Sequence, residues 1–167
     1  MDDTIREKII QEFMARAWLI RAGGSPELYA TDIGTNVLRA RSKIDPAEVD
    51  CVVIFPQPEE AENKYGKRLC RMSIKIEGIA KYYEENPSVV AEKILGDLIA
   101  CFLSDTWDRR RPVAGSSPAA YLDPYAESII YQGGGTSEYP DDNQLTVGAF
   151  INMQITYWTQ IGDPRAQ

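Results

Sequence analysis

LTVGAFINMQITY, residues Leu145 to Tyr157, is the stretch of sequence that decides the fold of this chain. Every odd-numbered position in it is apolar or aromatic, and most even-numbered positions carry threonine, asparagine or glutamine. This two-residue period is typical of a strand with one face in the core and the other outside it. The run is longer than a usual strand of roughly 3 to 10 residues. We therefore expect a long strand near the C-terminus to close an α+β domain.

Length and composition favour a single domain over residues 1–167. With 44% hydrophobic residues, the chain can bury a substantial core. Its net charge of −7 argues against binding nucleic acid through overall charge and is accounted for most simply by solubility. No apolar run reaches the roughly 18 residues that span a bilayer, and the acidic start Met1-Asp2-Asp3 does not look like a signal peptide. We expect a protein made and kept in the cytoplasm, with no membrane partner.

The cysteines and the missing histidines restrict the chemistry. Cys51, Cys70 and Cys101 are widely spaced, form no C-x-x-C pair, and are predicted to be reduced core residues. The sequence contains no histidine, which removes the usual Ser-His-Asp and Cys-His machinery and makes a zinc site improbable. We predict no catalytic residues, no metal and no cofactor.

Apolar periodicity predicts the element order α-β-β-β-α-β-β, with a mixed or antiparallel sheet of about four to five strands against two main helices. The first helix is expected to be capped by Asp2 or Asp3 and to end at Gly23-Gly24-Ser25-Pro26, and the second to open at Asn86-Pro87. The expected strands are Val37–Ile44 (with Arg39, Arg41 and Lys43 on one face), Cys51–Phe55, the alternating run from Cys70, Ser128–Gln132 and the final strand. Three excursions are expected: a charged, turn-rich, hairpin-like segment at 56–67, a loop at Asp105–Pro124, and a flexible tip at Gly133–Asp142.

Three patterns are candidates for enzymatic or nucleic-acid sites. Asp50, Glu62 and Lys64 could serve a Mg²⁺-dependent nuclease, but Glu62-Asn63-Lys64 is predicted to lie in a turn and not in an apolar strand. The run Gly133-Gly134-Gly135-Thr136 lacks the lysine and the spacing of a phosphate loop, so a flexible hairpin is favoured. Basic residues could form a local patch, but no aromatic stacking platform is predicted nearby, so a solvated face or a contact to an acidic neighbour is favoured over nucleic-acid binding. The members of this patch are Lys64, Lys67, Arg68, Arg71, Lys75 and Arg109 to Arg111.

The element order and the chain ending resemble the tail terminator and minor tail (tail completion) proteins of long-tailed bacteriophages and prophages. The resemblance covers most of the chain, from the opening helix through the buried helix with Ile94-Leu95-Gly96-Asp97-Leu98-Ile99. Its most specific part is Ile155-Thr156-Tyr157-Trp158-Thr159, followed closely by Gly162-Asp163-Pro164. The acidic segment at 56–67 and the loop at 105–124 depart from the family in length.

The resemblance implies a structural virion protein and no enzyme. Such proteins assemble, usually as a hexameric ring, on the end of the tail tube, stop its polymerisation and face the head-side connector or neck protein. The expected partners are therefore other copies of this chain, the tail tube protein and that connector, without sequence-specific nucleic-acid binding. A head completion or neck protein remains the alternative within the same class.

A ring needs two different surfaces on each subunit. We expect these surfaces to come from the charged and glycine-rich segments, which are poor in core residues. The predicted interface comprises Arg109, Arg110 and Arg111, the acidic residues Glu59, Glu60 and Glu62, and the glycines Gly133, Gly134 and Gly135.

Overall fold

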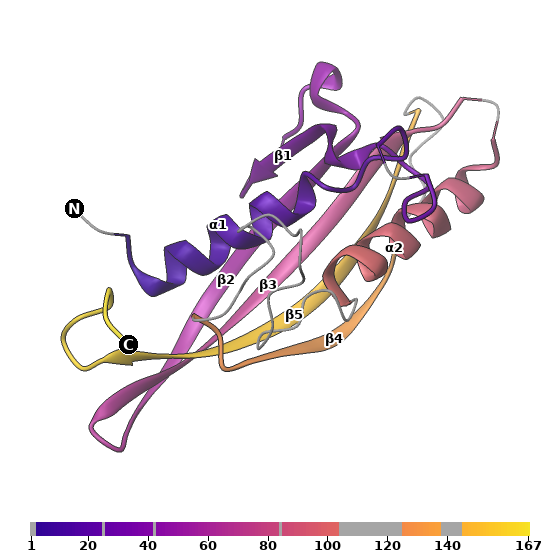
Figure 1. Ribbon diagram of the computed structural model, residues 1–167. Helices are drawn as coiled ribbons and strands as arrows, with labels where there is room; N and C mark the ends of the chain where they lie inside the picture. Colours follow the sequence, from indigo (N-terminus) through magenta and orange to yellow (C-terminus); the bar gives the residue numbers. More distant parts are fainter. Residues whose placement is uncertain (1–2, 25, 42, 84, 104–124, 138–144) are drawn as a thin grey trace.

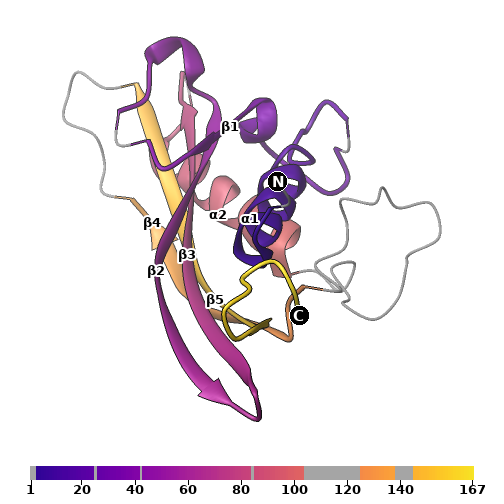
Figure 2. The same ribbon diagram turned by 90° about the vertical axis from the view of Figure 1, so that its left-hand side faces the viewer.

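A single five-stranded sheet organises the computed structural model, which describes residues 3–24, 26–41, 43–83, 85–103, 125–137 and 145–167 (Figure 1). The strands are β1 (Asn36–Arg39), β2 (Cys51–Lys64), β3 (Lys67–Lys81), β4 (Ser128–Thr136) and β5 (Thr146–Gln160). They lie in the order β1-β2-β3-β5-β4, with β1 parallel to β2 and the other neighbours antiparallel. Helices α1 (Ile5–Ala17) and α2 (Pro87–Leu103) cover one face of the sheet (Figure 2). The α+β class with two main helices and a mixed sheet is confirmed.

The central pair of strands, β3 and β5, carries the core. The two strands pair without a break from Lys67 opposite Gln160 to Lys81 opposite Thr146. Alternate side chains point to the helices and are buried; in the middle of the pair these are Ile74, Ile76, Ile151 and Met153. The period seen at 145–157 is therefore that of a strand with one helix-covered face, and it continues to the end of the strand.

Helix α1 is shorter than the sequence predicted. Its N-cap is Thr4 and not Asp2 or Asp3, because the Thr4 side chain accepts a hydrogen bond from the amide of Glu7. It ends at Ala17 and not at the glycines near residue 23, since the next amides, of Leu19 and Ile20, donate three residues back.

The two helices are joined to each other and to the loop before β1 through buried polar contacts. Arg16 is buried, and its Nε donates to the carbonyl of Cys101 at 3.0 Å. The carboxylate of Asp97, also buried, accepts from the amides of Ala30 and Thr31 and from the Thr31 hydroxyl. These bonds satisfy polar groups that would otherwise be costly to bury.

Three strand predictions were wrong in their bounds. Strand β1 stops at Arg39 because Ala40 takes a positive φ of 50°, and Arg39 and Arg41 then bind different acids, Glu7 and Glu48. Strand β2 runs on through Lys64, so most of the segment expected to be a turn-rich excursion is strand. Strand β4 likewise includes the three glycines expected to form a flexible tip. In both long strands the partner β3 or β5 continues alongside, and its backbone hydrogen bonds outweigh the weak local propensity of proline, glycine and acidic residues.

The other main predictions of position hold. Asn86 caps α2, with its side chain accepting from the Ser88 amide, and Pro87 is the first helical residue. All three cysteines are free and buried. The predicted loop at Asp105–Pro124 lies outside the described residues, as does the later part of the predicted tip.

Close packing of α2 on the sheet depends on Gly78 in β3. A Cβ there would lie 2.6 Å from Cγ2 of Ile94 and 2.8 Å from Cδ1 of Ile33. We expect Gly78→Val to destabilise the protein by about 1–3 kcal/mol, the usual effect of overpacking. The matched control is Gly96→Ala on the exposed side of α2, where nothing lies within 4 Å. It should stabilise by up to about 1 kcal/mol through helix propensity. Urea denaturation measures both; equal midpoints would contradict this packing.

Candidate assembly surfaces

The sheet has two long open edges among the described residues, one on each side. Strand β1 pairs only with Cys51–Ile54 of β2, so β2 from Phe55 to Lys64 has no described strand on its outer side, although the Gln57 carbonyl accepts a hydrogen bond from the Arg6 side chain. On the opposite side, β4 pairs with β5 and with no other described strand. The hairpin of β2 and β3 also extends past the ends of both helices (Figures 1 and 2). We call the two open sides of the sheet the β2 edge (Phe55–Lys64) and the β4 edge (Ser128–Thr136).

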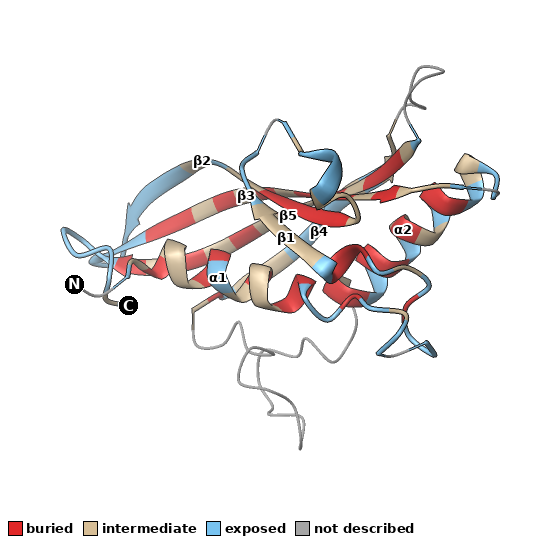
Figure 3. Ribbon diagram, turned by 90° about the horizontal axis from the view of Figure 1, so that it is seen from above, coloured by how far each residue is buried: buried red, intermediate tan, exposed pale blue. Residues whose placement is uncertain are grey.

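The β2 edge is proline-containing and acidic. Pro56 and Pro58 lack amide donors, and the register shifts between Pro56 and Glu59. Beyond this irregularity β2 is mostly exposed, whereas buried and intermediate residues alternate along most of β3 and β5 (Figure 3). Prolines, irregular register and charges are the features that keep an edge strand from pairing indiscriminately.

The turn that ends this hairpin holds a prominent aromatic residue. Lys64 and Lys67 close the ladder, and the two residues between them, Tyr65 and Gly66, have φ values of 53° and 75°. Left-handed conformations at both central positions are those of a two-residue type I′ turn. The Tyr65 side chain is 88% exposed at the tip.

Glu59 differs from Glu60 and Glu62 on the β2 edge because its side chain is partly buried against its own chain, whereas theirs are exposed. The Tyr157 hydroxyl donates to the Glu59 carboxylate, and Arg6 of α1 lies 3.6 Å from it. Burial raises the pKa of Tyr157, and the hydrogen bond to Glu59 raises it further. Glu60 and Glu62 lie toward the other face of the sheet, opposite Arg71 and Leu69. Only these two of the predicted acidic interface residues are well exposed.

The β4 edge has the opposite chemistry. It contains no charged residue and no proline, and Ile130 and Tyr131 are 52% and 40% exposed. Its register shifts between Tyr131 and Gly133, where φ is 124°. A Cβ on Gly134 would lie 2.4 Å from the carbonyl oxygen of Phe150, so this position needs glycine. A Cβ on Gly133 or Gly135 would meet nothing within 4 Å, which leaves open space on the face of the sheet to which these positions point.

The structure therefore separates the predicted interface residues into two groups on opposite sides of one sheet. The acidic group lies on the β2 edge and the glycine group on the β4 edge. Arg109, Arg110 and Arg111 lie outside the described residues. Sequence reasoning missed Tyr65, Ile130 and Tyr131 as exposed groups at these edges, and an aromatic or aliphatic residue at a strand edge or turn was the available signal. The interface itself stays a prediction.

The sheet face opposite the helices mixes aromatic and charged side chains. Lys75 lies over the rings of Phe55 and Phe150, at 5.7 and 5.0 Å from their centroids, and forms an ion pair with Glu77. Arg71 lies 3.8 Å from Glu62. Of the predicted basic patch, these two cations have acidic neighbours, and Lys64, Lys67 and Arg68 are exposed near the hairpin turn. The patch is thus broken up by acids on the same strands.

The residues considered for a nuclease site do not come together. Asp50 precedes β2, whereas Lys64 is its last residue. A strand of 14 residues spans roughly 45 Å at about 3.3 Å per residue. Asp50 therefore cannot bind the same metal ion as Glu62, and Lys64 lies too far from Asp50 to act in one site with it. The hypothesis of a nuclease site formed by these three residues is wrong. Across the described ranges, no group of three or more histidine, cysteine, aspartate or glutamate residues is placed to hold a metal ion.

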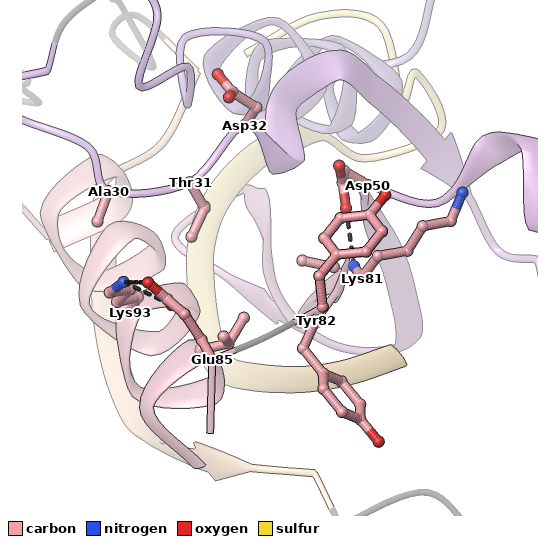
Figure 4. A pocket seen from close by; sticks show the side chains of 11 residues that line it. Ala30, Thr31, Asp32, Asp50, Lys81, Tyr82, Glu85 and Lys93 are labelled. Carbon is pink, nitrogen blue, oxygen red and sulfur yellow. Dashed lines mark hydrogen bonds and ion pairs between the residues drawn. The ribbon is translucent and has the colours of Figure 1, made fainter. Parts of the chain in front are cut away.

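Asp50 lines an open pocket of about 460 Å³ between the loop before β1, the end of β3 and the start of α2 (Figure 4). Its carboxylate accepts from the amide of Lys81 at 2.9 Å, and Lys93 forms an ion pair with Glu85 at 2.7 Å. These contacts hold chain segments together at one end of the fold. They give a structural reason for the charges that line the pocket.

Comparison with known proteins adds no family. No protein-family model matches the chain, and no curated protein does either. In the part of the chain that the structure describes, no helix combines the length and the apolar character needed to cross a membrane.

The contact between Glu59 and Tyr157 can be separated from a surface role by mutation. We expect Glu59→Ala to destabilise by about 1–3 kcal/mol, because it leaves the buried Tyr157 hydroxyl without its acceptor. Glu60→Ala, one residue along the same strand and exposed, should change stability by less than about 0.5 kcal/mol. Thermal and urea denaturation report both. If both variants are as stable as the original protein, the Glu59 contact does not hold the hairpin to the rest of the fold.

Proposed function

We propose that this protein is a non-enzymatic structural subunit of a long-tailed phage or prophage. In this proposal it caps the tail tube, ends tube polymerisation and forms the tail-side surface of the head–tail junction as a hexameric ring. The observation that carries the proposal is the pair of chemically different open edges on opposite sides of one sheet, among the described residues. The resemblance of the element order and chain ending to tail terminator proteins supplies the specific role.

The physical argument is one of symmetry. A closed ring of identical subunits is built from heterologous contacts, in which one surface of each subunit meets a different surface of the next. A charged, proline-containing edge and an uncharged, glycine-containing edge are two such surfaces. The hairpin end with exposed Tyr65 projects past the helices and offers a further surface for the tail tube or the connector.

Deleting the gene from the parent phage or prophage tests the role. We expect particles with tails of irregular or excessive length, seen by electron microscopy, because nothing then stops tube growth. Tails of normal length beside unjoined, filled heads would move the protein to head completion or the neck. Intact infectious particles would refute a virion role altogether.

Complementation of that deletion tests the assembly surfaces. We expect the doubly charge-reversed variant Glu60→Lys, Glu62→Lys to remain folded but to restore uniform tails poorly, since both exposed residues lie on the β2 edge. The control is Glu92→Lys, an exposed position on α2 and in neither edge strand, which should restore uniform tails. Equal restoration by the two variants would remove the β2 edge from the assembly surface.

A further inference from the structure

The two edges run in opposite directions, which makes them compatible as partners. From β2 to β3, to β5 and to β4, each step is antiparallel, so β4 runs opposite to β2. A second copy placed beside the first in the same orientation therefore brings its β2 antiparallel to β4. Such an arrangement continues the alternation of the sheet across the contact, with the well-aligned hydrogen bonds of antiparallel strands.

Backbone groups on both edges point outward to make such bonds. The Ser137 amide donates to the Gly148 carbonyl at 2.8 Å. Because hydrogen-bonded pairs alternate along an antiparallel ladder, Gly134 and Thr136 direct their amides and carbonyls away from β5. On β2, the two-residue turn closes at the Lys64–Lys67 pair. The same alternation turns the backbone groups of Ala61 and Asn63 away from β3.

The side chains of the two edges also complement each other. Gly133 and Gly135 leave open space on the sheet face opposite the helices, because they pair with Asn152 and Phe150 and a Cβ on either would meet nothing within 4 Å. Glu60, Glu62 and Lys64 are long side chains whose methylene groups can fill that space while their charges stay in water. Two β2 edges brought together would instead oppose acidic residues, which is destabilising. Two β4 edges would meet without charge repulsion, but their glycine runs would offer no side chains to pack against each other.

We infer that the β4 edge of one subunit pairs, strand to strand, with the β2 edge of a second copy of this chain, and that this pairing is the repeated contact of the assembly. The inference rests on the proposed function, because a closed ring is what uses both edges of every subunit. Strand addition of this kind takes its affinity from main-chain hydrogen bonds and its specificity from alternate side chains. Here the specificity lies in the acidic edge meeting the uncharged one.

Site-directed cross-linking tests the pairing in purified full-length protein. Ile130 on β4 and Glu62 on β2 both lie on the sheet face opposite the helices, since they are opposite Gln154 and Leu69. The native thiols are buried, and burial raises the pKa of Cys51 to about 11 and of Cys101 to about 12, so they react slowly with maleimides at neutral pH. With a short bismaleimide, mixing Ile130→Cys with Glu62→Cys should yield covalent dimers, and the double variant should yield a ladder of larger species.

Controls identify the partners. Ile130→Cys alone and Glu62→Cys alone should stay monomeric, and so should Ile130→Cys mixed with Glu92→Cys of α2. Adding Thr136→Pro to the Ile130→Cys variant should lower the dimer yield with Glu62→Cys about tenfold, because it removes one outward amide. Proline with its nitrogen facing away from the ladder is tolerated at an edge, so the melting temperature should change little.

Three results would overturn the inference. Dimers formed by Ile130→Cys alone would mean that β4 pairs with itself. No cross-link at any concentration up to the solubility limit would mean that the β4 edge does not pair with the β2 edge of a second copy. Equal yields with and without Thr136→Pro would mean that the contact is not strand pairing. The proposed function fails separately: a specific ladder together with normal tails in the deletion mutant would leave the pairing standing and refute the tail role.

Discussion

The ladder between β3 and β5 is the interaction on which the rest of the structure depends. It spans the full 15 residues of each strand and joins the two halves of the chain, since β3 comes before α2 and β5 after it. Both helices pack on its buried face, and each of its two strands supports one further long strand. Without this pair, neither β2 nor β4 would have a partner along its length. The ladder is also the reason that sequences with poor strand propensity can lie at the two edges.

On the proposed assembly, the features needed for folding and the features needed for contact between subunits lie on different parts of this sheet. The buried face of β3 and β5 is apolar and is covered by helices. The edges carry prolines, acids and glycines, residues that weaken a strand in isolation. A strand held on one side by a long ladder can tolerate them, because its own packing contributes little to the core. The edges are therefore free to be selected for contact with other molecules, while the centre is constrained by packing.

The sequence predicts this fold well where one physical rule dominates. Alternation over 145–157 predicted β5, and the Asn86-Pro87 pair predicted the start of α2, because a long two-residue period strongly favours a strand and a proline after a capping residue strongly favours a helix start. Prediction failed where tertiary pairing outweighed local preference. Pro56, Pro58 and the glycines of β4 are residues that usually interrupt a strand, yet both segments are strands because a neighbour lies beside them.

Tertiary strand pairing also limited how much of the candidate assembly surfaces the sequence could predict. Composition alone marked the acidic and glycine segments as surfaces, and the structure places them on opposite edges. Nothing in the linear sequence could have shown this, since the order β1-β2-β3-β5-β4 depends on how strands distant in the chain pair. Glu59 illustrates the remaining gap. It is one of three acids in a short run, and only its place in the pleat, toward Tyr157, removes it from the exposed group.

The asymmetry between the edges bears on when the subunits would associate. An uncharged edge such as β4 accepts many strands, and a protein with two of them would tend to aggregate without limit. An acidic edge with two prolines accepts few, and repels another of its own kind. A subunit with one edge of each type can bind a neighbour only by pairing β4 of one copy with β2 of the other. Each such contact is opposed by electrostatic repulsion, because every chain carries a net charge of −7. On the proposed pairing, single contacts are therefore weak, and ring closure supplies the stability that one edge contact lacks. A template that holds several subunits at once would then be the place where the ring forms, which is the situation at the end of a growing tail tube.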